Sequence, residues 1–159
     1  MELSIAVIDN FLPKPELVRQ QALNLDFFVE GSFPGKRSLA TDYEYRDFIK
    51  LKIENSLRIN IVEWVMDSFC FQLCLEGSKS WIHTDKCDYA GVLYLTPNAP
   101  IESGTNFFNK KNDIVDSIGN KFNRAIFYKA GQLHSSNLSG FGESANSGRL
   151  TQVFFFNVK

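Results

Sequence analysis

Residues 80–95, SWIHTDKCDYAGVLYL, combine an expected buried strand with two polar side chains, His83 and Asp85, and the prediction of the fold begins with this stretch. The second half, residues 89–95, is an apolar run of the length that is typical of a buried strand. Similar short segments recur after residue 60, separated by turn residues such as those at 76–78 and 119–120. The other strands expected in this region span 61–66, 68–75, 80–84, 105–109, 124–129, 132–136 and 149–158.

The first 60 residues carry helical periodicity in place of the strand pattern. A short strand is expected over 3–8. Pro15 suits the first position of a helix, and apolar residues then recur at helical spacing, which predicts a helix over 15–25. A second helix is expected over 46–58, with a loop at 31–35. Helices followed by many short strands predict a mainly β (α+β) fold, a jelly-roll barrel with N-terminal helices packed on one face.

A chain of 159 residues is expected to form one domain, 1–159. The strand and helices of 1–60 would pack on a jelly-roll core formed by 61–159. The hydrophobic fraction of 44%, with 15 Phe, is enough for a core that needs neither disulfides nor a structural metal. Three cysteines, an odd number, are typical of reduced thiols in a cytoplasmic protein.

Charge and hydropathy narrow the classes of partner. The net charge is −1 and the pI is about 6.1, which gives no electrostatic footprint for DNA or RNA. The N-terminal segment lacks the positive region of a signal peptide, and no apolar run approaches the roughly 20 residues of a membrane span. We therefore expect a cytoplasmic protein with no nucleic-acid partner and no membrane association.

The chain has two histidines, and one of them belongs to a His-x-Asp pattern. Because residues i and i+2 of a strand share a face, His83 and Asp85 can reach one metal ion. His134 lies about 50 residues downstream, in a strand that jelly-roll topology can bring alongside. Two imidazoles and one carboxylate are the facial triad that holds non-haem Fe(II). Cys87 is a weaker candidate on the same face, and the pattern can also arise by chance from unrelated structural histidines.

Further motifs follow one known order along the β region. They are His83-x-Asp85, Gly91-Val92-Leu93-Tyr94-Leu95, Gly104-Thr105-x-Phe107-Phe108, His134 and Arg149-x-Thr151. In this order the chain resembles the 2-oxoglutarate- and Fe(II)-dependent dioxygenase superfamily, and within it the prolyl-hydroxylase-like branch. The resemblance covers roughly residues 70–158. It implies a cupin-like double-stranded β-helix, which is the jelly roll, buttressed by the N-terminal helices.

The resemblance also implies a role for each motif. His83, Asp85 and His134 would hold Fe(II). The resemblance pairs Arg149 with the distal carboxylate of the co-substrate 2-oxoglutarate, which a planar guanidinium can bind with two charge-assisted hydrogen bonds. Thr151 would add a hydroxyl donor on the same face, and the phenol of Tyr94 would reach the same carboxylate. The expected reaction uses O2 and releases succinate and CO2, with hydroxylation of the substrate as the default outcome.

Two departures from the family pattern stand out. The spacing of 15 residues from His134 to Arg149 is longer than usual, because extra residues form the loop 139–148. This loop is either a mobile lid or a plain insertion. Ser103 replaces one glycine of the usual turn before Thr105. Three further side chains are candidates for the cavity wall: Gln72, Trp81 and Asn137. The loop 33–37 can overhang the barrel mouth and bring cations toward an acidic substrate, or it can simply be exposed.

A second class of function fits part of the same pattern. A non-enzymatic cupin-like metal- or ligand-binding module could hold Zn(II), or nothing, at the same three residues. Arg149 discriminates between the two, because a module without 2-oxoglutarate has no need of an arginine aimed at the metal. A structural jelly roll with vestigial site residues is a third interpretation. The substrate, an unidentified protein or small molecule, and the oligomeric state are not specified by the sequence.

Overall fold

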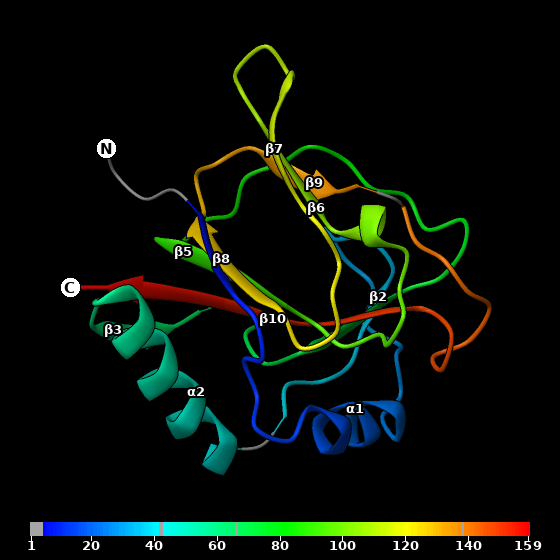
Figure 1. The fold of residues 1–159 in the computed structure, drawn as a ribbon, viewed down its shortest axis with the longest axis horizontal. Coiled ribbons are helices and arrows are strands. Elements are labelled where there is room, and N and C mark those ends of the chain that lie inside the picture. The colour runs from blue at the N-terminus through cyan, green and yellow to red at the C-terminus, as the bar shows by residue number, and fades with distance from the viewer. Residues whose placement is uncertain (1–4, 42, 66, 138) are drawn as a thin grey trace.

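The structure is a computed structural model that describes residues 5–41, 43–65, 67–137 and 139–159 (Figure 1). Its elements, in chain order, are β1 (Ile5–Ile8), α1 (Pro15–Leu23), β2 (Lys36–Arg37), α2 (Tyr43–Leu57), β3 (Ile61–Trp64), β4 (Phe71–Cys74), β5 (Tyr89–Tyr94), the 3-10 helix η1 (Ile101–Ser103), β6 (Thr105–Phe108), β7 (Ile114–Ile118), β8 (Ala125–Lys129), β9 (His134–Ser136) and β10 (Arg149–Val158). The described helices include none that is long and apolar enough to span a membrane.

The strands form two antiparallel sheets. The larger sheet has the order β1-β8-β5-β10-β4-β2, and β3 also pairs with β10. The smaller sheet has the order β7-β6-β9, and an isolated bridge between His83 and His134 places residue 83 beside β9. The prediction of a mainly β chain thus agrees with these antiparallel sheets and with the two α-helices, α1 and α2.

The two faces of the central strand β10 pack into two different apolar clusters. Phe154 and Phe156 lie on one face, in a buried cluster that includes Ala22 of α1 and Ile49 of α2. On the other face, Val153 and Phe155 join a second cluster. Because side chains alternate along a strand, a single strand fills two apolar layers. The other members of the second cluster include Tyr94, Phe107, Ile126 and Tyr128, so β6 of the smaller sheet packs against the larger sheet there.

Most element positions agree with the sequence pattern, but three differ. The expected strand 80–84 is absent apart from the single bridge at His83, because this segment pairs with the smaller sheet at one residue only. β7 was not predicted, since its residues are exposed or half-buried and carry no apolar alternation. β2 lies at the end of the expected loop. Residues 3, 4 and 66, which end two of the predicted strands, are outside the described residues.

An ion pair ties the end of β1 to the turn before β8. Arg124 donates from Nε to Asp9 Oδ1 at 2.6 Å and from Nη2 to Asp9 Oδ2 at 3.1 Å, and Lys121 lies 3.6 Å from the same carboxylate. The hydrogen bond from Arg124 is the main cause that lowers the pKa of Asp9 below its usual 3.8. The pair is therefore fully charged at neutral pH.

We expect Asp9→Asn to destabilise the fold by about 0.5–1 kcal/mol at neutral pH, a modest value because the carboxylate is partly exposed and screened. A carboxyl with a lowered folded-state pKa stabilises the fold above its unfolded pKa, and this contribution is lost as the pH falls through the folded pKa. Urea unfolding of wild type and variant should therefore differ at pH 7, and the difference should shrink as the pH falls through the lowered pKa of Asp9. A difference that stayed the same as the pH fell would contradict the role given to the charge.

Candidate metal centre and its cavity

His83, Asp85 and His134 converge, with ligand atoms within 4.8 Å of one another. Asp85 Oδ2 lies 3.3 Å from His134 Nε2, and Asp85 Oδ1 lies 3.8 Å from His83 Nε2. The backbone fixes this arrangement, because His83 and His134 exchange two N–H···O hydrogen bonds of 3.0 Å. Asp85 N also donates to Ala130 O at 2.8 Å. The three residues are thus held by main-chain pairing across a large sequence separation.

Both imidazoles are oriented by carbonyl groups two residues earlier in the chain. His83 Nδ1 lies 3.0 Å from Trp81 O, and His134 Nδ1 lies 2.8 Å from Gln132 O. A carbonyl only accepts, so each Nδ1 carries a proton, and each Nε2, which offers a lone pair when the ring is neutral, faces Asp85. Burial lowers the pKa of His83, which further favours its neutral form. Outer hydrogen bonds of this kind are what fix ligating histidines in metal sites.

The donor set fits a cation held on three sides. Two lone pairs and a carboxylate that face one another repel unless a positive charge lies between them, and such a set is the one that non-haem Fe(II) takes. Cys87 is not part of the group: its Sγ donates to Tyr89 O at 3.1 Å, and burial raises the pKa of the thiol to about 11. The weaker alternative of a thiolate ligand therefore has no geometric support.

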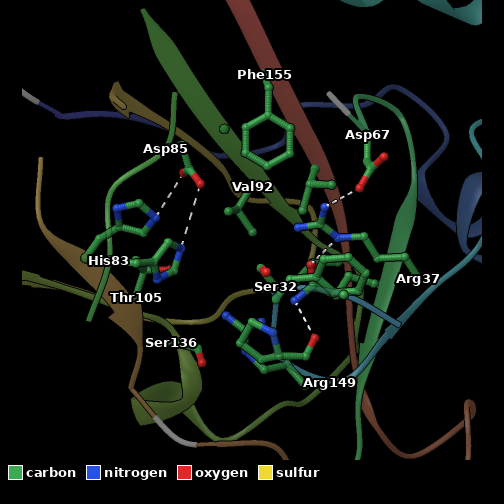
Figure 2. A pocket seen from close by; sticks show the side chains of 18 of the residues that line it. Ser32, Arg37, Asp67, His83, Asp85, Val92, Thr105, Ser136, Arg149 and Phe155 are labelled. Carbon is green, nitrogen blue, oxygen red and sulfur yellow. Dashed lines mark hydrogen bonds and ion pairs between the residues drawn. The ribbon is translucent and has the colours of Figure 1, made fainter. Parts of the chain in front are cut away.

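The triad lines a cavity of about 410 Å³ that opens between the two sheets. Figure 2 shows His83 and Asp85 at one side of this cavity, with Arg37 and Asp67 at the other. The remaining lining residues come from the loop 29–34 and from both sheets; they include Gln72, Val92, Thr105, Tyr128, Ser136, Arg149, Thr151, Val153 and Phe155. A volume of this size is typical of small-molecule and cofactor sites.

Arg149 is a buried guanidinium in this cavity, with a relative exposure of 4%. Its Nε donates to Ser103 O at 2.8 Å and its Nη2 to Gly104 O at 3.2 Å, so two neutral carbonyls fix its plane. Within the described parts of the chain, no Asp or Glu forms an ion pair with it. A buried charge that lacks a counter-ion is strongly unfavourable, which indicates that an anionic ligand belongs there.

Thr151 lies in the wall of the cavity, whereas Tyr94 lies behind that wall. Thr151 is buried, lines the cavity and lies two residues from Arg149 on the same face of β10. Tyr94 is fully buried behind the lining residues, and its Oη is 2.6 Å from Thr105 Oγ1, which does line the cavity. Burial raises the pKa of Tyr94, so the phenol stays protonated at neutral pH. The direct contact of Tyr94 with a ligand carboxylate stays a prediction.

Of the three further side chains that the sequence suggested for the cavity wall, one lines the cavity and two do not. Gln72 lines the cavity, donating from Nε2 to Pro34 O at 2.9 Å. Trp81 and Asn137 are exposed and do not line it. The Trp81 carbonyl accepts from His83, the Trp81 ring lies 6.2 Å from the His83 ring, and Asn137 accepts from Asn106. No residue of the loop 139–148 lines the cavity, so the lid interpretation has no support, whereas the loop 29–37 does contribute to the wall.

Sequence reasoning missed several cavity residues, and Asp67 and Tyr128 are two of them. Tyr128 follows Phe127 in β8, and alternation along that strand could have assigned the two rings to opposite faces. Its ring packs 4.7 Å from the His134 ring. Asp67 follows β3 in a loop without a local pattern, so its position beside Arg37 depends on tertiary contacts alone.

Comparisons with known proteins give a likeness at the level of structure. No protein-family model and no curated protein sequence matches the chain. A prolyl-4-hydroxylase from Pseudomonas putida matches with a TM-score of 0.64 and 16% identity, over 96% of this chain and 91% of that one. HygX from Streptomyces hygroscopicus, solved with nickel and 2-oxoglutarate bound, matches with a TM-score of 0.68 and 13% identity, over 96% and 82%.

A third solved structure is a prolyl hydroxylase from Trichoplax adhaerens in complex with a peptide of hypoxia-inducible factor. It matches with a TM-score of 0.65 and 16% identity, over 96% of this chain and 83% of that one. At such identities the likeness establishes the fold alone. The chain therefore shares its fold with these two prolyl hydroxylases and with HygX, as the resemblance in sequence order predicted.

Proposed function

We propose that this chain is an Fe(II)- and 2-oxoglutarate-dependent dioxygenase that hydroxylates a protein or small-molecule substrate. One observation carries the proposal: the His83–Asp85–His134 group lines the same cavity as the buried Arg149, which forms no ion pair with any acidic residue that the structure describes. A metal site alone would fit many proteins, but the additional guanidinium calls for a second, anionic ligand beside the metal. The double-stranded β-helix, with its two sheets facing each other around this cavity and the helices packed outside, is the fold we infer for this activity.

The roles of the residues follow from their contacts. His83, Asp85 and His134 would hold Fe(II), which supplies redox chemistry in which O2 oxidises 2-oxoglutarate to succinate and CO2 and hydroxylates the substrate. The hydrogen bonds of both Nδ1 atoms keep the two Nε2 atoms available as ligands. The backbone bridge between residues 83 and 134 would hold the two ligating residues next to each other.

Arg149 is oriented before any ligand arrives. Because Ser103 O and Gly104 O fix its plane, little side-chain entropy is lost when the guanidinium binds a carboxylate. Thr151, on the same face, offers a hydroxyl to the same group. Tyr94 acts one layer behind, where its hydrogen bond holds the Thr105 hydroxyl in position.

The remaining wall and the thiols complete the proposal. Val92, Val153 and Phe155 give the cavity an apolar side that excludes water from the metal and the substrate. The three cysteines are all free thiols, which supports a reducing compartment such as the cytoplasm.

The test is an anaerobic titration of Fe(II)-loaded protein with 2-oxoglutarate, followed by visible absorption. Bidentate binding of 2-oxoglutarate to the metal is expected to produce a charge-transfer band. Arg149→Ala is expected to raise the dissociation constant of 2-oxoglutarate by about 10- to 150-fold, which corresponds to the roughly 1.5–3 kcal/mol of a charged hydrogen-bonded contact.

A matched control is Arg124→Ala, which removes a guanidinium that binds Asp9 away from the cavity. It should leave the titration unchanged, and Arg149→Lys should lie between wild type and Arg149→Ala. The absence of the band at millimolar 2-oxoglutarate, in folded and iron-replete protein, would favour the non-enzymatic metal-binding module instead.

A further inference from the structure

A second buried guanidinium lines the same cavity, on the side away from the triad. Arg37 of β2 has a relative exposure of 6%. Its Nε donates to Gln72 Oε1 at 2.8 Å and its Nη1 to Asp67 Oδ2 at 3.0 Å. Its Cζ lies 3.9 Å from the centre of the Phe33 ring and 5.5 Å from that of Phe155. The guanidinium is thus held in place by hydrogen bonds from Nε and Nη1 and by its contacts with the Phe33 and Phe155 rings.

The charge of this group is directed into the cavity. The side chain of Arg37 is 8% exposed, whereas that of its partner Asp67 is 49% exposed, so water screens the negative end more than the positive end. Among the described residues, nothing forms a hydrogen bond with Nη2 of Arg37. Lys36, the preceding residue in the chain, is exposed, does not line the cavity and pairs with Glu30 at 3.5 Å, so it does not share this role.

Arg37 and the three residues of the candidate metal centre line the same cavity. Figure 2 shows Val92 and Phe155 between the two groups. A ligand that spans this distance would lie along an apolar wall with one end at Arg37.

We propose that Arg37 binds a carboxylate of the substrate, so that the substrate is a small monocarboxylic acid with an apolar body. This inference rests on the proposed function, because it assigns Arg149 to 2-oxoglutarate and leaves Arg37 for the substrate. Asp67 already offsets part of the charge of Arg37, which suits a monoanion better than a phosphate dianion. The apolar body would lie against Val92, Val153 and Phe155, which places carbon atoms of the substrate before the metal site.

Arg37 could instead serve only to fix the loop 29–37 to β4. The backbone already provides that link, because β2 pairs with β4, with Lys36 opposite Leu73 and Arg37 opposite Gln72. The two roles predict opposite effects for Asp67→Asn. Loss of the Asp67 charge would leave Arg37 more positive and strengthen the binding of an anion, whereas loss of a purely structural pair would weaken every property of the pocket.

The experiment uses hexanoate as the probe and hexanamide as its uncharged counterpart. Each is titrated by calorimetry into Zn(II)-loaded protein that is saturated with 2-oxoglutarate, so that the Arg149 position is already filled. We expect hexanoate to bind to the wild type and hexanamide to bind at least about tenfold more weakly. Arg37→Gln should weaken hexanoate by a similar factor, and Asp67→Asn should tighten it by a few-fold.

Lys36→Gln is the matched control, since it removes the neighbouring positive charge outside the cavity and should leave hexanoate binding unchanged. Thermal unfolding of each variant separates loss of fold from loss of binding. Equal binding by wild type and Arg37→Gln, competition of hexanoate with 2-oxoglutarate, weaker binding by Asp67→Asn, or no binding of hexanoate would each overturn the inference. Failure of 2-oxoglutarate itself to bind would instead refute the proposed function.

Discussion

Asp85→Ala is expected to lower the affinity for Fe(II) by more than about 100-fold, since loss of a mere outer-sphere partner already costs 10- to 100-fold. Asp85 is the only carboxylate in the candidate ligand group, and both of its oxygens face the histidine Nε2 atoms. Without it, two neutral imidazoles remain and no negative charge offsets the dication. Metal stoichiometry after anaerobic equilibrium dialysis measures the effect directly.

Asp26→Ala is a suitable control because Asp26 is exposed and lies outside the cavity. A metal that binds only the folded state stabilises it, by about 2.7 kcal/mol at a free concentration of 100 times the dissociation constant. The wild type and Asp26→Ala should therefore gain thermal stability with Fe(II) or Zn(II), and Asp85→Ala should gain little. If Asp85→Ala retained one tightly bound metal ion per chain, the ligand assignment would be wrong.

The three residues of the predicted metal site do lie together, but the strand geometry that suggested His83 and Asp85 as a pair is not present. The rule that i and i+2 face one side of a strand suggested His83 and Asp85 as a pair, yet the segment is not a strand. A single bridge to β9 and the hydrogen bond from Asp85 N to Ala130 O place the two residues instead. The spacing was informative because the chemistry needs these residue types, and the long-range pairing that brings His134 to them is not encoded locally.

The same distinction explains what could not be predicted around the cavity. β10 was predicted with its observed bounds because a long apolar run leaves little ambiguity. The exposed strand β7 has no apolar face, and so no periodicity marks it. Arg37 appeared in the sequence as part of an exposed or overhanging loop, and its burial depends on contacts with Gln72, Asp67 and Phe33 from three separate segments. Contacts of this kind arise from the tertiary fold.

Phe154→Ala is expected to destabilise the fold by about 3–5 kcal/mol, the range for deletion of a large buried aromatic side chain. Phe154 has no exposed surface and belongs to the cluster between the larger sheet and the helices. Its ring packs edge-on to Phe69 at 5.3 Å and lies 6.2 Å from Phe127 and 6.5 Å from Trp64. Such aromatic pairs add about 0.5–1.5 kcal/mol each beyond the buried area. Urea unfolding monitored by circular dichroism measures the loss.

The neighbouring Phe155→Ala provides the contrast, because its ring faces the cavity on the opposite side of β10. A side chain that already borders a void loses fewer packing contacts, so its replacement should cost less stability than that of Phe154. It should still weaken the binding of an apolar ligand, since Phe155 lines the wall between the metal site and Arg37. Adjacent residues of one strand would then divide their effects, with stability lost at position 154 and ligand binding lost at position 155. Equal losses of stability in the two variants would contradict this assignment of the two faces, and with it the place of the cavity between the sheets.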